Sequence, residues 1–307
     1  MKFGVLFTSH PHIDLEPYPH RDVHARTTAE ILEVDRLGYD TAWIAEHHFS
    51  NSYGILPDPF TYIGYLAAQT EHIKLGPAVM TLPLYNPIRV VENAGFADIL
   101  SNGRFILGLG SGYRPYEFEG MGVPFDERRD IQEEALEIVL DALHHRRIKH
   151  QGKYFNLDVS GDYEIYPVGL QTPHVPLYLA AGTDRSIGVA AQHGCGLMLS
   201  TLPAFDKVAT QTEFYRTALD DAPEKWRGNP ACGHIDQARW VYVAESDAKA
   251  KEDSSAGLVH HIKNFMAKNA AGYLGTVSEK DQGGELDYDE LAETTLLHGS
   301  PDTVIRR

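Results

Sequence analysis

Residues 41–49 read TAWIAEHHF, an apolar run of strand length that ends in one carboxylate and two imidazole side chains. Further short apolar runs recur along the chain. They are Lys2–Thr8, Ile73–Leu82, Arg104–Leu109, Pro176–Ala181 and Leu197–Ser200, with Ala238–Ala244 as a further candidate. Because these runs are continuous rather than alternating, they are typical of strands that are buried on both faces of a parallel sheet.

Segments with helical features separate these runs. They are Thr27–Leu37, Asp58–Gln69, Pro87–Leu100, Glu127–Leu143, Asp184–His193 and Phe205–Leu219. Gly38 follows the first as a C-terminal cap, and proline stands near the start of the second and third. In the fourth, an apolar face at helical spacing is formed by Ile131, Ala135, Ile138, Val139 and Ala142. This alternation predicts a (β/α)8 TIM barrel or a doubly wound α/β sheet.

We expect one domain over residues 1–307, with excursions at about 144–175 and 270–290. The second excursion is Gly-rich and acidic, and we expect a surface loop or lid there. The final residues, HGSPDTVIRR (298–307), predict a turn, an N-cap and the start of a helix. We therefore expect the last strand and helix of a barrel to be absent from the chain.

The composition narrows the class of protein. The 307 residues include 27 Lys and Arg against 43 Asp and Glu, which gives a formal net charge of −16. Such a charge disfavours binding to nucleic acid or to an anionic membrane surface. The two cysteines, Cys195 and Cys232, do not suffice for a disulfide framework, and no secretory signal or membrane span is evident. We expect a cytoplasmic protein with a small-molecule substrate.

Polar or Gly-rich residues follow the predicted strands at their C-terminal ends. The segments are 9–12 (SHPH), 46–49 (EHHF), 80–83 (MTLP), 110–113 (GSGY) and 181–184 (AGTD). These ends meet at one face of a parallel barrel, where active sites form. His47 or His48 could serve there as a base, an acid or a hydrogen-bonding group, with Glu46 orienting a ring or pairing with an arginine. A buried structural histidine is an equally good interpretation.

His10 and His12 lie two residues apart, so on a strand they share a face and could both bind a metal ion. Barrel metallohydrolases also need histidines at the fifth and sixth strand ends. Those ends read AAG and STLP here. We therefore predict no metal site and retain a metallohydrolase only as an alternative.

Two Gly-containing segments could accept a phosphate. GLGSG (108–112) departs from a dinucleotide fingerprint and fits better as a flexible loop beside a flat or phosphorylated ligand. GTDRS (182–186) leads into a helix whose N-terminus suits a phosphate, although simple capping by Thr183 or Asp184 explains it equally well. Arg129 could supply a counter-charge, or form a surface ion pair with Asp126 or Glu133.

The chain resembles the bacterial luciferase-like flavin-dependent monooxygenases (the alkanal monooxygenase family). The matching motifs are TAWIAEHHF, LGPAVMTLPLYNPIRVVE (75–92), SNGRFILGLGSG (101–112) and AAQHG (190–194), in family order over most of residues 1–200. The resemblance implies a TIM barrel that takes reduced flavin mononucleotide (FMN) from a separate reductase and reacts with molecular oxygen. It implies a flavin hydroperoxide that oxygenates a small organic substrate such as an aldehyde or ketone. It also implies a homodimer formed through the helices that flank the second and third strands. The apolar run 59–68 would suit this interface, although a buried core face explains the run equally well.

The resemblance also assigns residues. His47 matches the catalytic base, and Ala78 and Val79 match the pair against the flavin ring, where the family often has a cis peptide bond. The positions around the flavin phosphate are matched by Arg129, Thr183 and Ser186, together with Gly182 and Ser111, which replace a glutamate and an arginine of the luciferase α chain. The reactive cysteine of that α chain is replaced by Gly110, so light emission is not implied.

Three alternatives remain. A deazaflavin-dependent hydride-transfer enzyme would share the barrel, but the Glu-His-His sequence disfavours it mildly. A metallohydrolase depends on His10 and His12 alone. A non-catalytic flavin-binding barrel is the third. An entrance to the site lined by aromatic side chains is suggested by Tyr85, Tyr113, Tyr116 and Phe118, which could equally be packing residues.

Overall fold

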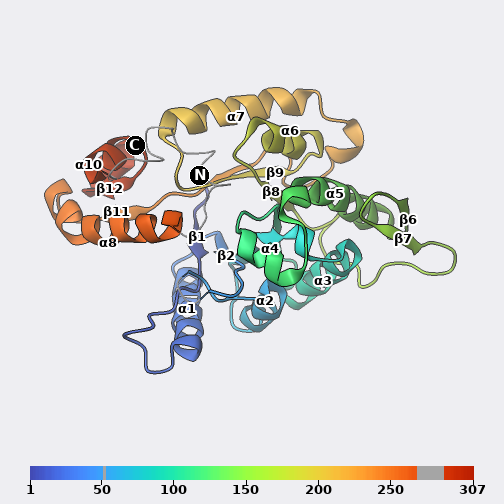
Figure 1. The fold of residues 1–307 in the computed structure, drawn as a ribbon, viewed down its shortest axis with the longest axis horizontal. Coiled ribbons are helices and arrows are strands. Elements are labelled where there is room, and N and C mark those ends of the chain that lie inside the picture. The colour runs from blue at the N-terminus through green and yellow to red at the C-terminus, as the bar shows by residue number, and fades with distance from the viewer. Residues whose placement is uncertain (51–52, 268–286) are drawn as a thin grey trace.

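The computed structural model of the chain describes residues 1–50, 53–267 and 287–307. It consists mainly of parallel strands and the helices that connect them (Figure 1). The strands are β1 (Gly4–Phe7), β2 (Thr41–Ile44), β3 (Lys74–Pro77), β4 (Met80–Thr81), β5 (Leu107–Gly110), β6 (Ile148–Gln151), β7 (Asn156–Val159), β8 (Leu177–Ala180), β9 (Gly196–Leu199), β10 (Ile235–Gln237), β11 (Val241–Val243) and β12 (Leu297–Gly299). The α-helices are α1 (Pro19–Arg36), α2 (Pro59–Ala67), α3 (Pro87–Leu100), α4 (Pro115–Met121), α5 (Arg128–His145), α6 (Asp184–Gln192), α7 (Phe205–Asp220), α8 (Asp247–Ala267), α10 (Tyr288–Thr294) and α11 (Pro301–Arg306). Short 3₁₀ turns occupy Leu82–Leu84, Phe125–Glu127 and Glu224–Trp226.

Within the two parallel sheets, the strands are arranged in the order in which they occur along the chain, as in a TIM barrel. One parallel sheet has the order β1-β2-β3, and a second has the order β4-β5-β8-β9-β10. A bridge between Leu75 and Phe105 joins the two sheets, and β11 pairs in parallel with β12. Among the described residues no ladder joins β1 to β11 or β12. The fold is therefore a TIM-barrel fold with a partial barrel of hydrogen-bonded strands, which confirms the predicted fold class.

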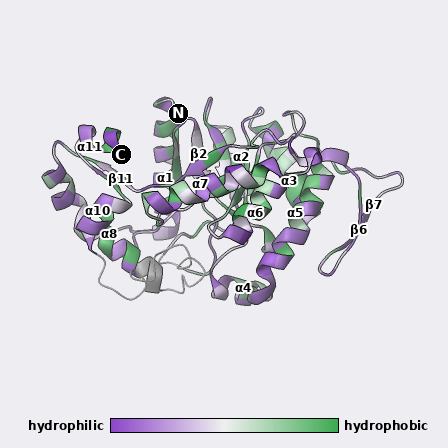
Figure 2. Ribbon diagram, turned by 90° about the horizontal axis from the view of Figure 1, so that it is seen from above, coloured by the Kyte–Doolittle hydropathy of each residue, from purple (hydrophilic) through white to green (hydrophobic). Residues whose placement is uncertain are grey.

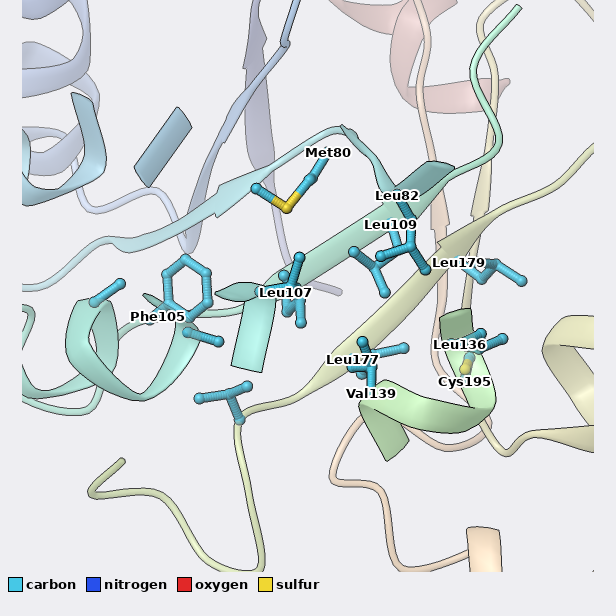
Figure 3. Close-up of a cluster of buried hydrophobic side chains, with 14 of the residues drawn as sticks. Met80, Leu82, Phe105, Leu107, Leu109, Leu136, Val139, Leu177, Leu179 and Cys195 are labelled. Atoms are coloured by element: carbon cyan, nitrogen blue, oxygen red, sulfur yellow. The ribbon is translucent and has the colours of Figure 1, made fainter. Parts of the chain in front are cut away.

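The core lies between these strands and the helices around them. All five residues of the predicted apolar face of α5, Ile131, Ala135, Ile138, Val139 and Ala142, are buried. Figure 2 shows hydrophobic and hydrophilic residues on different sides of this helix. Figure 3 shows the apolar cluster of strand and helix side chains; those labelled are Met80, Leu82, Phe105, Leu107, Leu109, Leu136, Val139, Leu177, Leu179 and Cys195. Each large aliphatic side chain buried here contributes about 1.5–3 kcal/mol relative to exposure to water.

Several boundaries differ from the prediction. The run 73–82 is not one strand, because it is interrupted at a cis peptide bond between Ala78 and Val79, which separates β3 from β4. Helix α1 begins at Pro19, eight residues before the predicted start. Strand β10 and the helices α4, α8 and α10 were not predicted. A strand, β12, stands where a turn was expected, and α11 follows it as expected.

Of the two predicted excursions, the structure describes the first fully and the second only in its last residues. Residues 144–175 contain the antiparallel hairpin β6–β7, which projects from one end of the molecule (Figure 1). The predicted lid at 270–290 lies almost entirely outside the described residues; only Asp287, which caps α10, and the first residues of that helix are described. None of the described helices combines the length and the apolar character needed to cross a lipid bilayer.

Candidate active site

Four ionisable residues meet at the C-terminal end of β2. Glu46, His47 and His48 follow this strand after one intervening residue, Ala45, and are buried, although ionisable residues are usually exposed. The backbone of β2 pairs with both β1 and β3, so the position of the three residues is set in the middle of a sheet. Helix α4 contributes the fourth residue, Glu117, which is also buried.

Glu117 orients His47. Its Oε1 atom lies 3.2 Å from Nδ1 of His47 and accepts a hydrogen bond from the backbone N–H of His48 at 2.9 Å. Because a carboxylate accepts, Nδ1 of His47 carries the proton and Nε2 is left as the basic nitrogen. Among the described residues none is hydrogen-bonded to Nε2. Burial lowers the pKa of His47, and the opposing effect of Glu117 does not reverse this. The imidazole is therefore neutral near pH 7.

Backbone holds His47 from the other side. A Cβ atom at Gly54 would lie 2.7 Å from Cδ2 of His47 and 2.6 Å from the carbonyl oxygen of Thr8, and Gly54 has a φ of +56°. Only glycine meets both requirements, so the chain can return across the imidazole at this position. The backbone N–H of His47 donates to the carbonyl oxygen of Leu56. The ring is thus fixed by a carboxylate and by close backbone packing.

His48 belongs to a separate buried network. Its Nε2 atom lies 3.0 Å from Oε1 of Glu46, whose Oε2 accepts a hydrogen bond from the hydroxyl of Tyr85 at 3.0 Å. Burial alone would lower the pKa of His48, but the hydrogen bond and the charge of Glu46 raise it overall. Burial raises the pKa of Glu46. Glu46 therefore orients the ring of His48, one of the two roles proposed for it, and the two histidines have different partners.

An arginine and two tyrosines form a wall beside His47. The ring centroid of Tyr53 lies 4.9 Å from that of His47, and the centroid of Tyr113 lies at 6.1 Å. The Arg114 guanidinium is buried over both tyrosine rings, at 4.4 Å and 5.1 Å, and donates to the hydroxyl of Tyr116. Its positive charge adds to the lowering of the pKa of His47. The wall therefore consists of two aromatic rings and one positively charged guanidinium.

Glycine brings β5 close to the peptide bond between β3 and β4. A Cβ at Gly110 would lie 2.4 Å from Cγ2 of Val79, and one at Gly108 would lie 2.2 Å from the carbonyl oxygen of Pro77. The two strands therefore approach more closely than side chains on β5 would allow. Ala78 and Val79 are partly exposed at this point, and Ser111 follows β5 in the same partly exposed state.

The predicted phosphate segment is a helix N-terminus with a capping box. The Thr183 hydroxyl accepts from the backbone N–H of Ser186, and the Ser186 hydroxyl accepts from the backbone N–H groups of Gly182 and Thr183. The capping interpretation is therefore correct for the structure as it stands. Arg129 is partly exposed near the start of α5 and forms no ion pair with a described residue. The expected partner Glu133 binds Arg185 instead.

His10 and His12 do not form a metal site with other described residues. Their ring centroids are 6.4 Å apart, and the neighbours of His10 are Tyr53 and His261, each at 6.2 Å. Within residues 1–50, 53–267 and 287–307, no group of three His, Cys, Asp or Glu side chains is arranged to hold a metal ion. The metallohydrolase alternative thus gains no support from the described part of the chain.

Comparison with known proteins shows the family. The family model of the luciferase-like monooxygenases matches residues 1–307. The chain belongs to the luciferase-like monooxygenases.

Two of the curated relatives of this chain carry the names of activities, and a third is uncharacterised. The oxygenase component of the flavin-dependent trigonelline monooxygenase of Acinetobacter baylyi is 30% identical over 72% of this chain and 60% of its own length. Limonene 1,2-monooxygenase of Rhodococcus erythropolis is 27% identical over 80% of this chain and 62% of its own length. An uncharacterised Sinorhizobium fredii protein is 38% identical over 55% of this chain and 47% of its own length. The chain thus spans about half to three fifths of the length of these relatives.

Solved structures agree on the fold. A monooxygenase from Streptomyces bottropensis superposes with a TM-score of 0.80 at 22% identity, over 99% of this chain and 86% of its own. The FMN complex of the oxygenating constituent of a Pseudomonas putida 3,6-diketocamphane monooxygenase gives 0.78 at 21% identity, over 100% and 86%. A coenzyme F420-dependent reductase from Methanopyrus kandleri gives 0.67 at 20% identity, over 99% and 88%.

Three residues of this site, Arg114, Glu117 and Tyr53, were not predicted from the sequence. Helix α4, which carries Glu117, has only seven residues, too few for a helical hydrophobic period to be recognised. Its ends nevertheless carry a usable signal: Pro115 stands at the first helical position and Gly122 ends the helix with a φ of +71°.

Proposed function

We propose that this chain is the oxygenase of a two-component flavin-dependent monooxygenase. It takes reduced FMN from a separate reductase and uses molecular oxygen to oxygenate a small organic substrate. The observation that carries the proposal is the buried, neutral His47, whose Nδ1 donates to Glu117 and whose Nε2 is left basic at the C-terminal end of β2. When bound, the reduced flavin would supply the electrons that activate oxygen.

The residues present fit an FMN molecule. The glycines of β5 leave Ala78 and Val79 accessible for a flat ring system. The N-terminus of α6 at Gly182, Thr183 and Ser186 suits the phosphate. Arg129, which has no described acidic partner, supplies a positive charge, and Ser111 a hydroxyl.

The residues of the chain have separate roles in this mechanism. His47 holds or accepts a proton at Nε2, and its neutral state near pH 7 is what a base requires. Glu117 is a positioning residue that keeps the proton on Nδ1. The wall formed by Arg114, Tyr53 and Tyr113 limits access of water to the imidazole. Exclusion of water favours transfer of oxygen to the substrate over loss of the activated oxygen to solvent.

A homodimer is the second part of the proposal. Helices α2 and α3 keep large apolar side chains exposed: Tyr65 at 57%, Phe96 at 52%, Ile99 at 38% and Leu100 at 47%. The other apolar residues of α2 are buried in the core, apart from Phe60, which is partly buried against it, so the interface is smaller than the whole apolar run 59–68 suggests. Such a patch on two neighbouring helices suits a symmetric interface.

The test is anaerobic titration of the purified chain with reduced FMN, followed by mixing with oxygenated buffer. We expect tight binding and a delay before the oxidised flavin spectrum returns, and we expect His47→Ala to bind the flavin but shorten the delay. His12→Ala is the matched control and should behave as the unmodified chain. Binding of a reduced deazaflavin but not of reduced FMN would favour a hydride-transfer enzyme. Binding of neither would refute the proposal.

A further inference from the structure

A guanidinium with unused hydrogen-bonding capacity follows β10. Arg239 donates from Nη1 to the carbonyl oxygens of Thr201, at 3.1 Å, and Pro203, at 2.7 Å. Its guanidinium carbon lies 4.8 Å from the ring centroid of Phe205. One end of the group is thus held in place by the loop between β9 and α7.

The other edge of the same guanidinium is unpartnered. Nε and Nη2 are buried, and no described residue accepts a hydrogen bond from either atom. No described carboxylate forms an ion pair with Arg239. Burial lowers the pKa of Arg239 to about 10, so the group is still charged at neutral pH. A buried charge with unsatisfied donors is unfavourable unless a ligand or ion supplies the acceptors.

The geometry of this edge indicates the ligand. The Nε and Nη2 hydrogens of a guanidinium are parallel and match the two oxygens of a carboxylate in a bidentate pair. Ser200 directly precedes Thr201, whose carbonyl oxygen Arg239 binds, and its Oγ is buried without a described partner, so this hydroxyl can add a donor. Gln237, two residues before Arg239, joins the strands by donating from Nε2 to the carbonyl oxygen of Ser200 at 2.6 Å.

Arg239 lies at the same end of the barrel as His47. The next residue, Trp240, packs in the apolar cluster that includes Tyr53 and Tyr113, the two rings that contact His47. Leu202, which lies between the two residues whose carbonyl oxygens Arg239 binds, belongs to the same cluster, so the guanidinium lies beside the residues that pack with these rings. An anion bound to it would belong to a molecule that reaches into the site.

We propose that Arg239, with Ser200, binds the carboxylate of the organic substrate, so that the enzyme acts on carboxylate-bearing compounds. This inference rests on the proposed monooxygenase function. The phosphate of FMN offers related oxyanion chemistry, and the experiment must separate the two.

The test measures binding of benzoate and of its neutral analogue benzamide to the flavin-free full chain by calorimetry. We expect benzoate to bind more tightly than benzamide. We expect Arg239→Gln to weaken benzoate binding at least tenfold without changing benzamide binding. Arg239→Lys retains the charge but not the parallel donors, and should lose several-fold. Arg216→Gln removes an exposed arginine from α7 and is the matched control, expected to have no effect.

Three outcomes would overturn the inference. Benzoate could bind no better than benzamide, or Arg239→Gln could bind benzoate as the unmodified chain does. Arg239→Gln could also weaken binding of reduced FMN but not of reduced riboflavin, which would assign the arginine to the flavin phosphate. Because the benzoate assay contains no flavin, its result is independent of whether the chain binds reduced FMN.

Discussion

Replacement of Glu117 by glutamine tests whether this carboxylate organises the site. Oε1 accepts two hydrogen bonds, from Nδ1 of His47 at 3.2 Å and from the backbone N–H of His48 at 2.9 Å, and Glu117 is only 3% exposed. Glutamine has nearly the same shape and retains one acceptor oxygen. Glu117→Gln therefore removes the charge and leaves the packing unchanged.

The expected loss of stability in Glu117→Gln follows from the two hydrogen bonds that Oε1 accepts. A hydrogen bond to a charged group contributes about 1.5–3 kcal/mol and a neutral one about 0.5–1.5 kcal/mol. Loss of charge assistance in both should therefore lower the free energy of unfolding by about 2 kcal/mol. Without the carboxylate, the proton of His47 is also less firmly held on Nδ1.

Equilibrium urea unfolding measures the first effect, and ¹⁵N NMR of the His47 ring nitrogens measures the second. Glu119→Gln, an exposed glutamate of the same helix, is the control and should change stability by less than about 0.5 kcal/mol. We expect ¹⁵N shifts typical of an Nδ1–H imidazole in the unmodified chain and a mixed tautomer in Glu117→Gln. If both variants are equally stable and the His47 shifts do not move, the carboxylate does not position the imidazole.

Three further predictions concern other parts of the molecule. Gly54→Ala should lower the free energy of unfolding in urea by at least about 1 kcal/mol more than Gly122→Ala does. Both glycines have a positive φ, but only a Cβ at position 54 would meet His47. Equal losses in the two variants would contradict the close packing at Gly54. Burial lowers the pKa of His174 in the folded state below the value of about 6.5 of an unperturbed histidine, so its contribution to stability is complete above pH 6.5 and is lost as the pH falls below it. Below pH 6.5 the free energy of unfolding should therefore fall less steeply with decreasing pH in His174→Gln than in the unmodified chain, by up to about 1.4 kcal/mol per pH unit. An unchanged slope would refute this. Phe96→Asp should convert the proposed dimer to a monomer in analytical ultracentrifugation, whereas Val168→Asp, similarly exposed on the excursion, should not.

Local patterns in the sequence were sufficient for the fold class. Short continuous apolar runs and capped helical segments depend on neighbouring residues, so α3 was predicted at its observed bounds and α5, α6 and α7 within two residues of theirs. The face of α5 was predicted residue by residue, because helical spacing alone decides which side chains share a face. The position of the site after β2 followed from the rule that the C-terminal ends of parallel strands meet.

Contacts between distant residues were decided only by the tertiary structure. Glu117 is 70 positions from His47 and Arg239 is 38 from Thr201, and neither spacing carries a periodic signal. The sequence identified His47 as a candidate but could not say which of its ring nitrogens carries the proton, since that depends on a carboxylate brought in by α4. The lowered pKa of His47 likewise results from burial, which belongs to the packed chain as a whole. Sequence therefore determined which groups stand at the strand ends, and packing determined their protonation, partners and orientation.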